Sequence, residues 1–78
     1  MVELEGIQEL RKEIDKIDER LIVLLNTRLE LARRIGEIKR ESNIPVLDED
    51  REKEVLERAG DFKGIFREII MMSKKKQG

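Results

Sequence analysis

The stretch that decides the fold is residues 4–42, LEGIQELRKEIDKIDERLIVLLNTRLELARRIGEIKRES. Its apolar residues recur almost throughout at steps of three or four: Leu4, Ile7, Leu10, Ile14, Ile17, Leu21, Leu24, Leu31, Ile35 and Ile38. That spacing is typical of one face of an amphipathic helix, and no proline interrupts it. We therefore predict a single helix over residues 4–42, about 58 Å long at about 1.5 Å per residue.

The rest of the chain predicts two shorter helices. Pro45 ends the long helix, because proline lacks an N–H and disfavours helical geometry in the residue before it. A second helix is predicted over residues 48–58, with Asp48 as its N-cap, and a third over residues 62–77, with Asp61 as its cap. The predicted fold class is all-α, with three helices of which one is very long.

A chain of 78 residues allows one domain, here residues 1–78, and a domain of this size buries only a modest core. No disulfide is available to stabilise it. The helix over residues 4–42 cannot cover its own apolar face, so it must pack on other helices or on another copy of the chain. The sequence therefore predicts a homodimeric helical bundle.

The composition excludes several classes of function. There is no cysteine and no histidine, which removes thiolate nucleophiles, zinc–sulfur sites and the usual general base, and we expect no metal and no cofactor. The 17 basic and 18 acidic residues balance, and the lysines at 74–76 suit the negative end of a helix dipole, so we expect no nucleic-acid partner. The longest apolar run, residues 21–25, is far below the roughly 20 residues of a membrane span, and no signal peptide is visible. We expect a cytoplasmic protein that makes no membrane contact and, if it is an enzyme, works by placed charges.

Polar residues occupy positions where the pattern predicts apolar ones. Arg28 falls in the series of sevens that starts at Ile7, and Lys39, eleven residues later, points to nearly the same side. Taken singly, such residues can be explained as a register-fixing charge, a cap or a fraying helix end. Together they predict a polar pocket inside a helical bundle, with surplus positive charge for a carboxylate or phosphate ligand. The other members are Asp48, Arg51 and Glu52 in the second helix, and Ser73 and Gln77 in the third.

Four blocks of sequence carry a resemblance to a known family. They are Leu10-Arg11-x-x-Ile14-Asp15-x-Ile17-Asp18-x-x-Leu21, Leu24-Leu25-x-x-Arg28-x-x-x-Ala32-x-x-Ile35-Gly36-x-x-Lys39, Pro45-Val46-x-Asp48-x-x-Arg51-Glu52 and Ile69-Ile70-x-x-Ser73-x-x-x-Gln77. With these blocks the chain resembles the all-α chorismate mutases, the intertwined helical dimers of aromatic amino-acid biosynthesis. The resemblance implies an intertwined homodimeric bundle and the Claisen rearrangement of chorismate to prephenate, with no covalent intermediate.

The resemblance also implies a role for each polar residue. Arg28 and Arg11 hold the substrate carboxylates, and Lys39 and Gln77 donate to the ether oxygen, which gains negative charge as the C–O bond breaks. Glu52 accepts from the ring hydroxyl. Asp48, at the start of the second helix, assists Glu52, and Arg51 and Ser73 complete the polar shell.

Arg11 lies seventeen residues before Arg28, hence about 25 Å away on one straight helix. A ligand of chorismate's size cannot touch both from one chain. If Arg11 belongs to the site, it must come from the partner chain of an antiparallel dimer, and each dimer then holds two shared sites. Without the family resemblance, Arg11 reads as an exposed residue paired with Asp15.

Three alternatives stay open at this point. An isochorismate pyruvate-lyase of the same fold uses a similar cationic pocket. A non-catalytic helical dimerisation module explains the long apolar face, although it does not explain inward-facing polar groups on every helix. The chain also fits a regulatory domain of a larger polypeptide.

Overall fold

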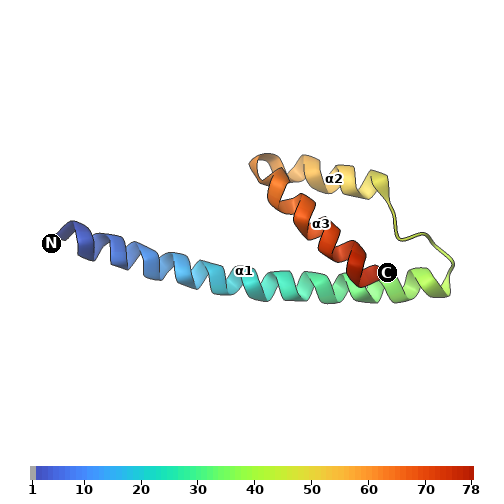
Figure 1. Cartoon of the computed structure of the whole chain (residues 1–78), viewed down its shortest axis with the longest axis horizontal. Coiled ribbons are helices and arrows are strands. Elements are labelled where there is room, and N and C mark those ends of the chain that lie inside the picture. The colour runs from blue at the N-terminus through green and yellow to red at the C-terminus, as the bar shows by residue number, and fades with distance from the viewer. Residues whose placement is uncertain (1) are drawn as a thin grey trace.

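A computed structural model describes residues 2–78, so residue 1 of the predicted domain 1–78 lies outside the described residues. The elements are α1 (Val2–Glu41), α2 (Glu49–Ala59), the 3-10 turn η1 (Gly60–Phe62) and α3 (Lys63–Gln77). The fold class is all-α, as predicted. Figure 1 shows α2 and α3 as a hairpin beside the C-terminal half of α1, with the end of α3 against α1.

The end of α1 is built from backbone hydrogen bonds around Asn43. The amide of Ile44 donates to the carbonyl of Lys39 at 2.8 Å, and the amide of Asn43 donates to the carbonyl of Arg40 at 3.4 Å. Asn43 has a φ of 56°, a left-handed conformation that asparagine tolerates better than most residues. This pair of bonds is a Schellman motif, and Pro45 directly after it prevents the helix from resuming.

The start of α2 confirms the predicted cap. The carboxylate of Asp48 accepts from the amide of Arg51 at 3.0 Å, which satisfies one free N–H of the first turn. The predicted cap for the third helix is wrong. Gly60 adopts a φ of 57° and leads directly into η1, so Asp61 lies inside this 3-10 turn and α3 begins at Lys63 with no side-chain cap.

Small residues let α3 pack closely on α1. A Cβ built on Gly36 would lie 2.6 Å from the Cα of Gln77 and 2.7 Å from its carbonyl oxygen, so only glycine fits at this crossing. One turn earlier in α1, Ala32 is buried, and the other buried apolar residues are Val55 of α2 and Ile70 of α3. The core within one chain is therefore small and sits where the hairpin meets α1.

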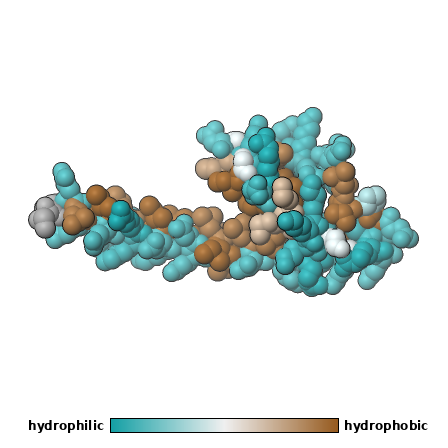
Figure 2. Space-filling view, viewed as in Figure 1, coloured by the Kyte–Doolittle hydropathy of each residue, from teal (hydrophilic) through white to brown (hydrophobic). Residues whose placement is uncertain are grey.

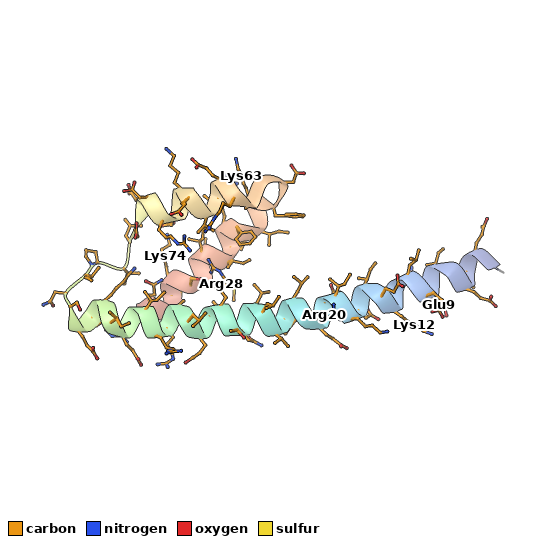
Figure 3. The ribbon with its side chains drawn as sticks, turned by 180° about the vertical axis from the view of Figure 1, so that it is seen from behind. Glu9, Lys12, Arg20, Arg28, Lys63 and Lys74 are labelled. Carbon is orange, nitrogen blue, oxygen red and sulfur yellow. The ribbon has the colours of Figure 1, made fainter. Side chains whose placement is uncertain are left out.

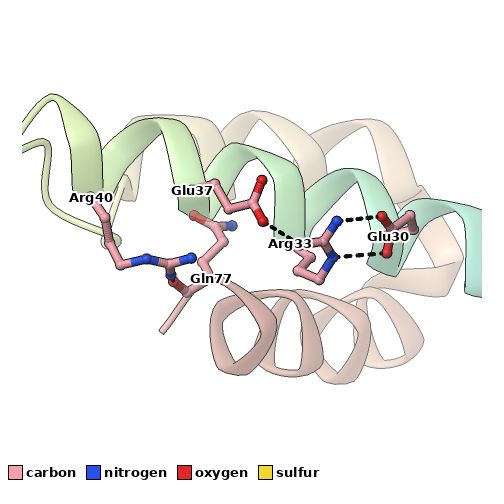
Figure 4. A network of polar contacts seen from close by, with 5 residues as sticks. All are labelled: Glu30, Arg33, Glu37, Arg40 and Gln77. Atoms are coloured by element: carbon pink, nitrogen blue, oxygen red, sulfur yellow. Dashed lines mark hydrogen bonds and ion pairs between the residues drawn. The ribbon is translucent and has the colours of Figure 1, made fainter.

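The outer face of α1 carries a charged network beside this crossing (Figure 4). Arg33 forms ion pairs with Glu30 and Glu37. The hydrogen bond from Arg33 lowers the pKa of Glu30, and the two carboxylates raise the pKa of the Arg33 guanidinium. About one turn after Glu37, the side chain of Arg40 donates to the backbone carbonyl of Gln77 at 2.8 Å, and this bond joins the end of α3 to α1.

The N-terminal half of α1 extends beyond the hairpin, and no other described element lies beside it (Figure 1). Its apolar residues form a continuous row on the surface (Figure 2), and those from Leu4 to Ile17 are 47% to 61% exposed. The radius of gyration is 17.3 Å, against about 11.5 Å for a compact domain of this length. The accessible surface is 6830 Å², against about 4,900 Å² for a compact monomer of this mass. Nothing in residues 2–78 covers this apolar row.

Within residues 2–78, no helix combines the length and the apolar character needed to cross a bilayer.

Candidate active site

A cavity of about 380 Å³ lies between α1, α2 and α3, within the size range of small-molecule sites. Figure 3 shows Arg28 of α1 and Lys74 of α3 both directed into the region between α1 and the hairpin. Seven of the predicted site residues line the cavity: Arg28, Lys39, Asp48, Arg51, Glu52, Ser73 and Gln77. The cavity is completed by Leu31, Ala32, Ile35, Val46, Val55, Ile70 and Lys74.

Lys39 and Gln77 meet at one end of the cavity. The ammonium of Lys39 donates to Oε1 of Gln77 at 2.7 Å and to the carbonyl of Val46 at 2.8 Å. Because Lys39 has only donors, the oxygen of the Gln77 amide must face it, which leaves the amide nitrogen of Gln77 as a free donor. Two N–H donors, one of them cationic, are thereby held side by side.

Arg28 lines the cavity beside Ser73, one turn of α3 before Gln77. Its guanidinium donates to the hydroxyl of Ser73 at 2.5 Å, and that hydroxyl donates to the carbonyl of Ile69 at 2.8 Å. Partial burial lowers the pKa of Arg28, and the charge of Arg51 lowers it further. Both causes disfavour the cationic form of Arg28, so an anion bound between the two arginines would offset their repulsion.

Asp48 and Arg51 lie at the start of α2, where it faces the cavity. The Asp48 carboxylate already accepts from the Arg51 amide as the helix cap, and the Arg51 side chain reaches Glu54 at 3.5 Å. Asp48 therefore has a structural task as well as a place in the cavity wall.

Lys74 is a cavity residue that the sequence reasoning missed. Its ammonium lies 3.2 Å from Oε1 of Glu52, and this pair joins α3 to α2 inside the cavity. The assignment of Lys74 to helix-dipole compensation alone is therefore wrong, whereas Lys75 is exposed. The available signal was its position four residues after Ile70, on the face of α3 that carries the apolar stripe.

Arg11 is not part of this cavity. It is an exposed residue on the half of α1 that extends beyond the hairpin. No ion pair joins it to Asp15 or to another side chain in the described part of the chain, so the alternative pairing with Asp15 is not seen. Within one chain, Arg11 and Arg28 remain separated along one continuous helix.

The charges of the cavity define the ligand that it favours. Four cationic and two acidic side chains line it, which leaves a surplus of two positive charges. Apolar side chains of α1, α2 and α3 lie beside these charges in the cavity wall. Within residues 2–78, no cluster of acidic side chains has the arrangement of a metal site. The arrangement suits a small dianion that also carries a hydrogen-bonding group for Glu52.

Comparison with known proteins gives a consistent result. The sequence model of the family described as "Chorismate mutase type II" matches residues 10–78. A solved structure, a conserved hypothetical protein from Pyrococcus furiosus, is 53% identical, with a TM-score of 0.93 over 94% of this chain and 96% of that one. This structure shares both fold and much of the sequence.

Of three curated relatives, two carry the words chorismate mutase in their names and one does not. A "Chorismate mutase" of Methanocaldococcus jannaschii is 40% identical over 70% of this chain and 56% of its own length. A "Bifunctional chorismate mutase/prephenate dehydratase" of Aquifex aeolicus is 53% identical over 70% of this chain and 15% of its own. A "3-dehydroquinate dehydratase" of Pyrobaculum aerophilum is 43% identical over 92% of this chain and 24% of its own. The chain thus spans between 15% and 56% of the length of these three relatives.

Proposed function

Because the chain belongs to the chorismate mutase type II family, the isomerases of aromatic amino-acid biosynthesis, we propose that it rearranges chorismate to prephenate. The observation that carries the proposal is the convergence of Lys39 and Gln77, 2.7 Å apart, in a cavity with surplus positive charge. The reaction is a unimolecular shift that needs no nucleophile and no proton transfer. It therefore suits a chain without cysteine or histidine.

The cavity's first task in this proposal is to bind the substrate dianion in a compact, chair-like conformation. Arg28 receives one carboxylate, and its bond to Ser73 fixes the plane of the guanidinium. Lys39 lies near the other carboxylate, and Arg51 adds positive charge from α2. Holding the two reacting carbons together removes much of the entropy cost of the rearrangement.

The second task is to stabilise the transition state. The ether oxygen becomes more negative as its bond to carbon breaks, so donors aimed at it bind the transition state better than the substrate. Lys39 and the free amide N–H of Gln77 supply two such donors. Glu52 accepts from the ring hydroxyl, and Asp48 supports it at the start of α2.

The same proposal requires a second copy of the chain. The protein exposes about 1,900 Å² more surface than a compact monomer of its mass, an area within reach of an obligate dimer interface. An antiparallel partner covering the apolar row of α1 would bring its own Arg11 toward Arg28 and Lys39. We therefore propose an intertwined homodimer with two shared sites, in which Arg11 binds a substrate carboxylate in trans.

The proposal is tested by incubating the purified protein with chorismate and following substrate loss and prephenate formation. Wild type should turn over chorismate, and Lys39→Ala should lower kcat/KM roughly 100- to 1000-fold, the usual cost of losing one charge-stabilising donor. Lys75→Ala, which removes an exposed lysine of α3, is the matched control and should stay near wild type. Absence of turnover by folded dimeric wild type would overturn the function, and pyruvate release from isochorismate instead would favour the lyase.

A further inference from the structure

The ion pair between Lys74 and Glu52 lies inside the proposed site but has no role in the mechanism above. The two side chains come from α3 and α2, line the same cavity, and meet at 3.2 Å. They are 39% and 26% exposed, so both are partly withdrawn from water. A partly exposed ion pair adds little to folding stability, so stability alone does not explain its place in the cavity.

The Glu52 carboxylate contacts the Lys74 ammonium through one of its two oxygens. Within residues 2–78, the Glu52 carboxylate pairs with Lys74 alone, while the neighbouring Arg51 pairs with Glu54. The contact uses Oε1 of Glu52 and leaves Oε2 free as an acceptor. A glutamate has three side-chain torsions, so without this contact its carboxylate would sample several positions in the cavity.

We propose that Lys74 is a positioning residue: it holds one oxygen of Glu52 so that the other faces the substrate's ring hydroxyl. The inference rests on the proposed function, in which Glu52 accepts from that hydroxyl. Lys74 lines the cavity together with Glu52. Its two lysine neighbours in the run, Lys75 and Lys76, are exposed and do not line the cavity.

The test compares chorismate turnover by four single variants. Lys74→Met keeps the aliphatic stem without the charge and should lower kcat/KM about tenfold through misplacement of Glu52. Lys74→Arg should recover most of this loss, and the control Lys75→Met should stay within about twofold of wild type. In the background of the fourth variant, Glu52→Gln, adding Lys74→Met should cost less than about twofold, because the group that it positions has already been changed.

A second readout separates positioning from a general loss of structure. Wild type should prefer chorismate over an analogue without the ring hydroxyl, and Lys74→Met should lose most of that preference. A structural role would slow both substrates equally and lower the melting temperature in parallel. The inference would be overturned if Lys74→Met lowered kcat/KM equally in the wild-type and Glu52→Gln backgrounds, or if it left the preference for chorismate over the analogue unchanged. In either case, turnover of chorismate by wild type would still uphold the function. Inactive wild type would overturn both.

Discussion

At the residue scale, Gly36 decides whether Gln77 can reach Lys39. The backbone of Gln77 lies where a Cβ on Gly36 would be, with 2.6 Å to its Cα. The obstructing atoms are backbone, so a side chain at position 36 must push the end of α3 away from α1. Gln77 would then lose its bond with Lys39 and its place in the cavity.

Gly36→Ala should therefore reduce both activity and stability. We expect kcat/KM to fall at least about tenfold, since small displacements of catalytic groups are costly, and the free energy of unfolding to fall by about 1–3 kcal/mol from overpacking. The control is Gly64→Ala, where nothing lies within 4 Å of the new Cβ. That change should keep activity and stabilise α3 by roughly 0.5–1 kcal/mol. Chorismate kinetics and urea unfolding of both variants measure the difference, and wild-type activity in Gly36→Ala would contradict it.

Arg28 and Lys74 show which site residues the sequence could predict and which it could not. Arg28 interrupts a regular apolar series, so the sequence alone marks it as a candidate site residue. Lys74 sits in a run of three lysines at a helix end, where a solvent-facing explanation suffices. Its contact with Glu52 depends on how α3 folds back on α2 through η1, and no spacing rule encodes that angle. Arg28 breaks the apolar pattern of its helix, whereas Lys74, four residues after Ile70 on the apolar stripe of α3, was missed because a charge at a helix end explained it.

At the element scale, α1 has two halves with different surroundings. Its C-terminal half packs against α3 through Ala32 and Gly36, while its N-terminal half carries a row of half-exposed apolar residues. Isolated helical segments are marginally stable in water without tertiary contacts. The N-terminal half of α1 therefore needs a partner surface, and we attribute that surface to the N-terminal half of α1 in another copy.

Ile14→Glu should dissociate the dimer by placing a charge within the apolar row. Burying an unpaired carboxylate against apolar side chains is strongly unfavourable. The charge-matched control, Gln8→Glu, adds the same charge at an exposed polar position of α1, about 120° around the helix from Ile14. Sedimentation velocity at equal concentrations should show a smaller species for Ile14→Glu and a dimer for wild type and Gln8→Glu. Three indistinguishable profiles would contradict this assignment of the interface.

The elements were predicted well wherever one strong rule applied. The apolar periodicity and Pro45 predicted α1 to within two residues, and Asp48 caps α2 as expected. The start of α3 was misassigned because Asp61 is a good cap by type, while Gly60, with its positive φ, sends the chain into a 3-10 turn first. Backbone conformation at one glycine outweighed a side-chain preference, and that competition cannot be read from residue types alone.

At the scale of the whole molecule, the proposed dimer would complete both the fold and the site. One chain spans 61 Å in its longest direction and buries little of its apolar surface, and its cavity contains none of the described residues 2–27. Arg11 lies on that uncovered part of α1. A single pairing of two chains would cover the apolar row and add a further cation to each cavity. Dimerisation and catalysis are, in this account, one property.

Mixing two inactive variants tests this central claim most directly. Arg11→Ala and Arg28→Ala dimers, each with strongly reduced chorismate turnover, are combined in equal amounts and allowed to exchange subunits, with exchange confirmed by mass spectrometry. In a heterodimer, one site keeps Arg28 from one chain and Arg11 from the other, while the second site lacks both. Random exchange should therefore restore about one quarter of wild-type activity. Confirmed exchange without any recovery would contradict a site shared between chains.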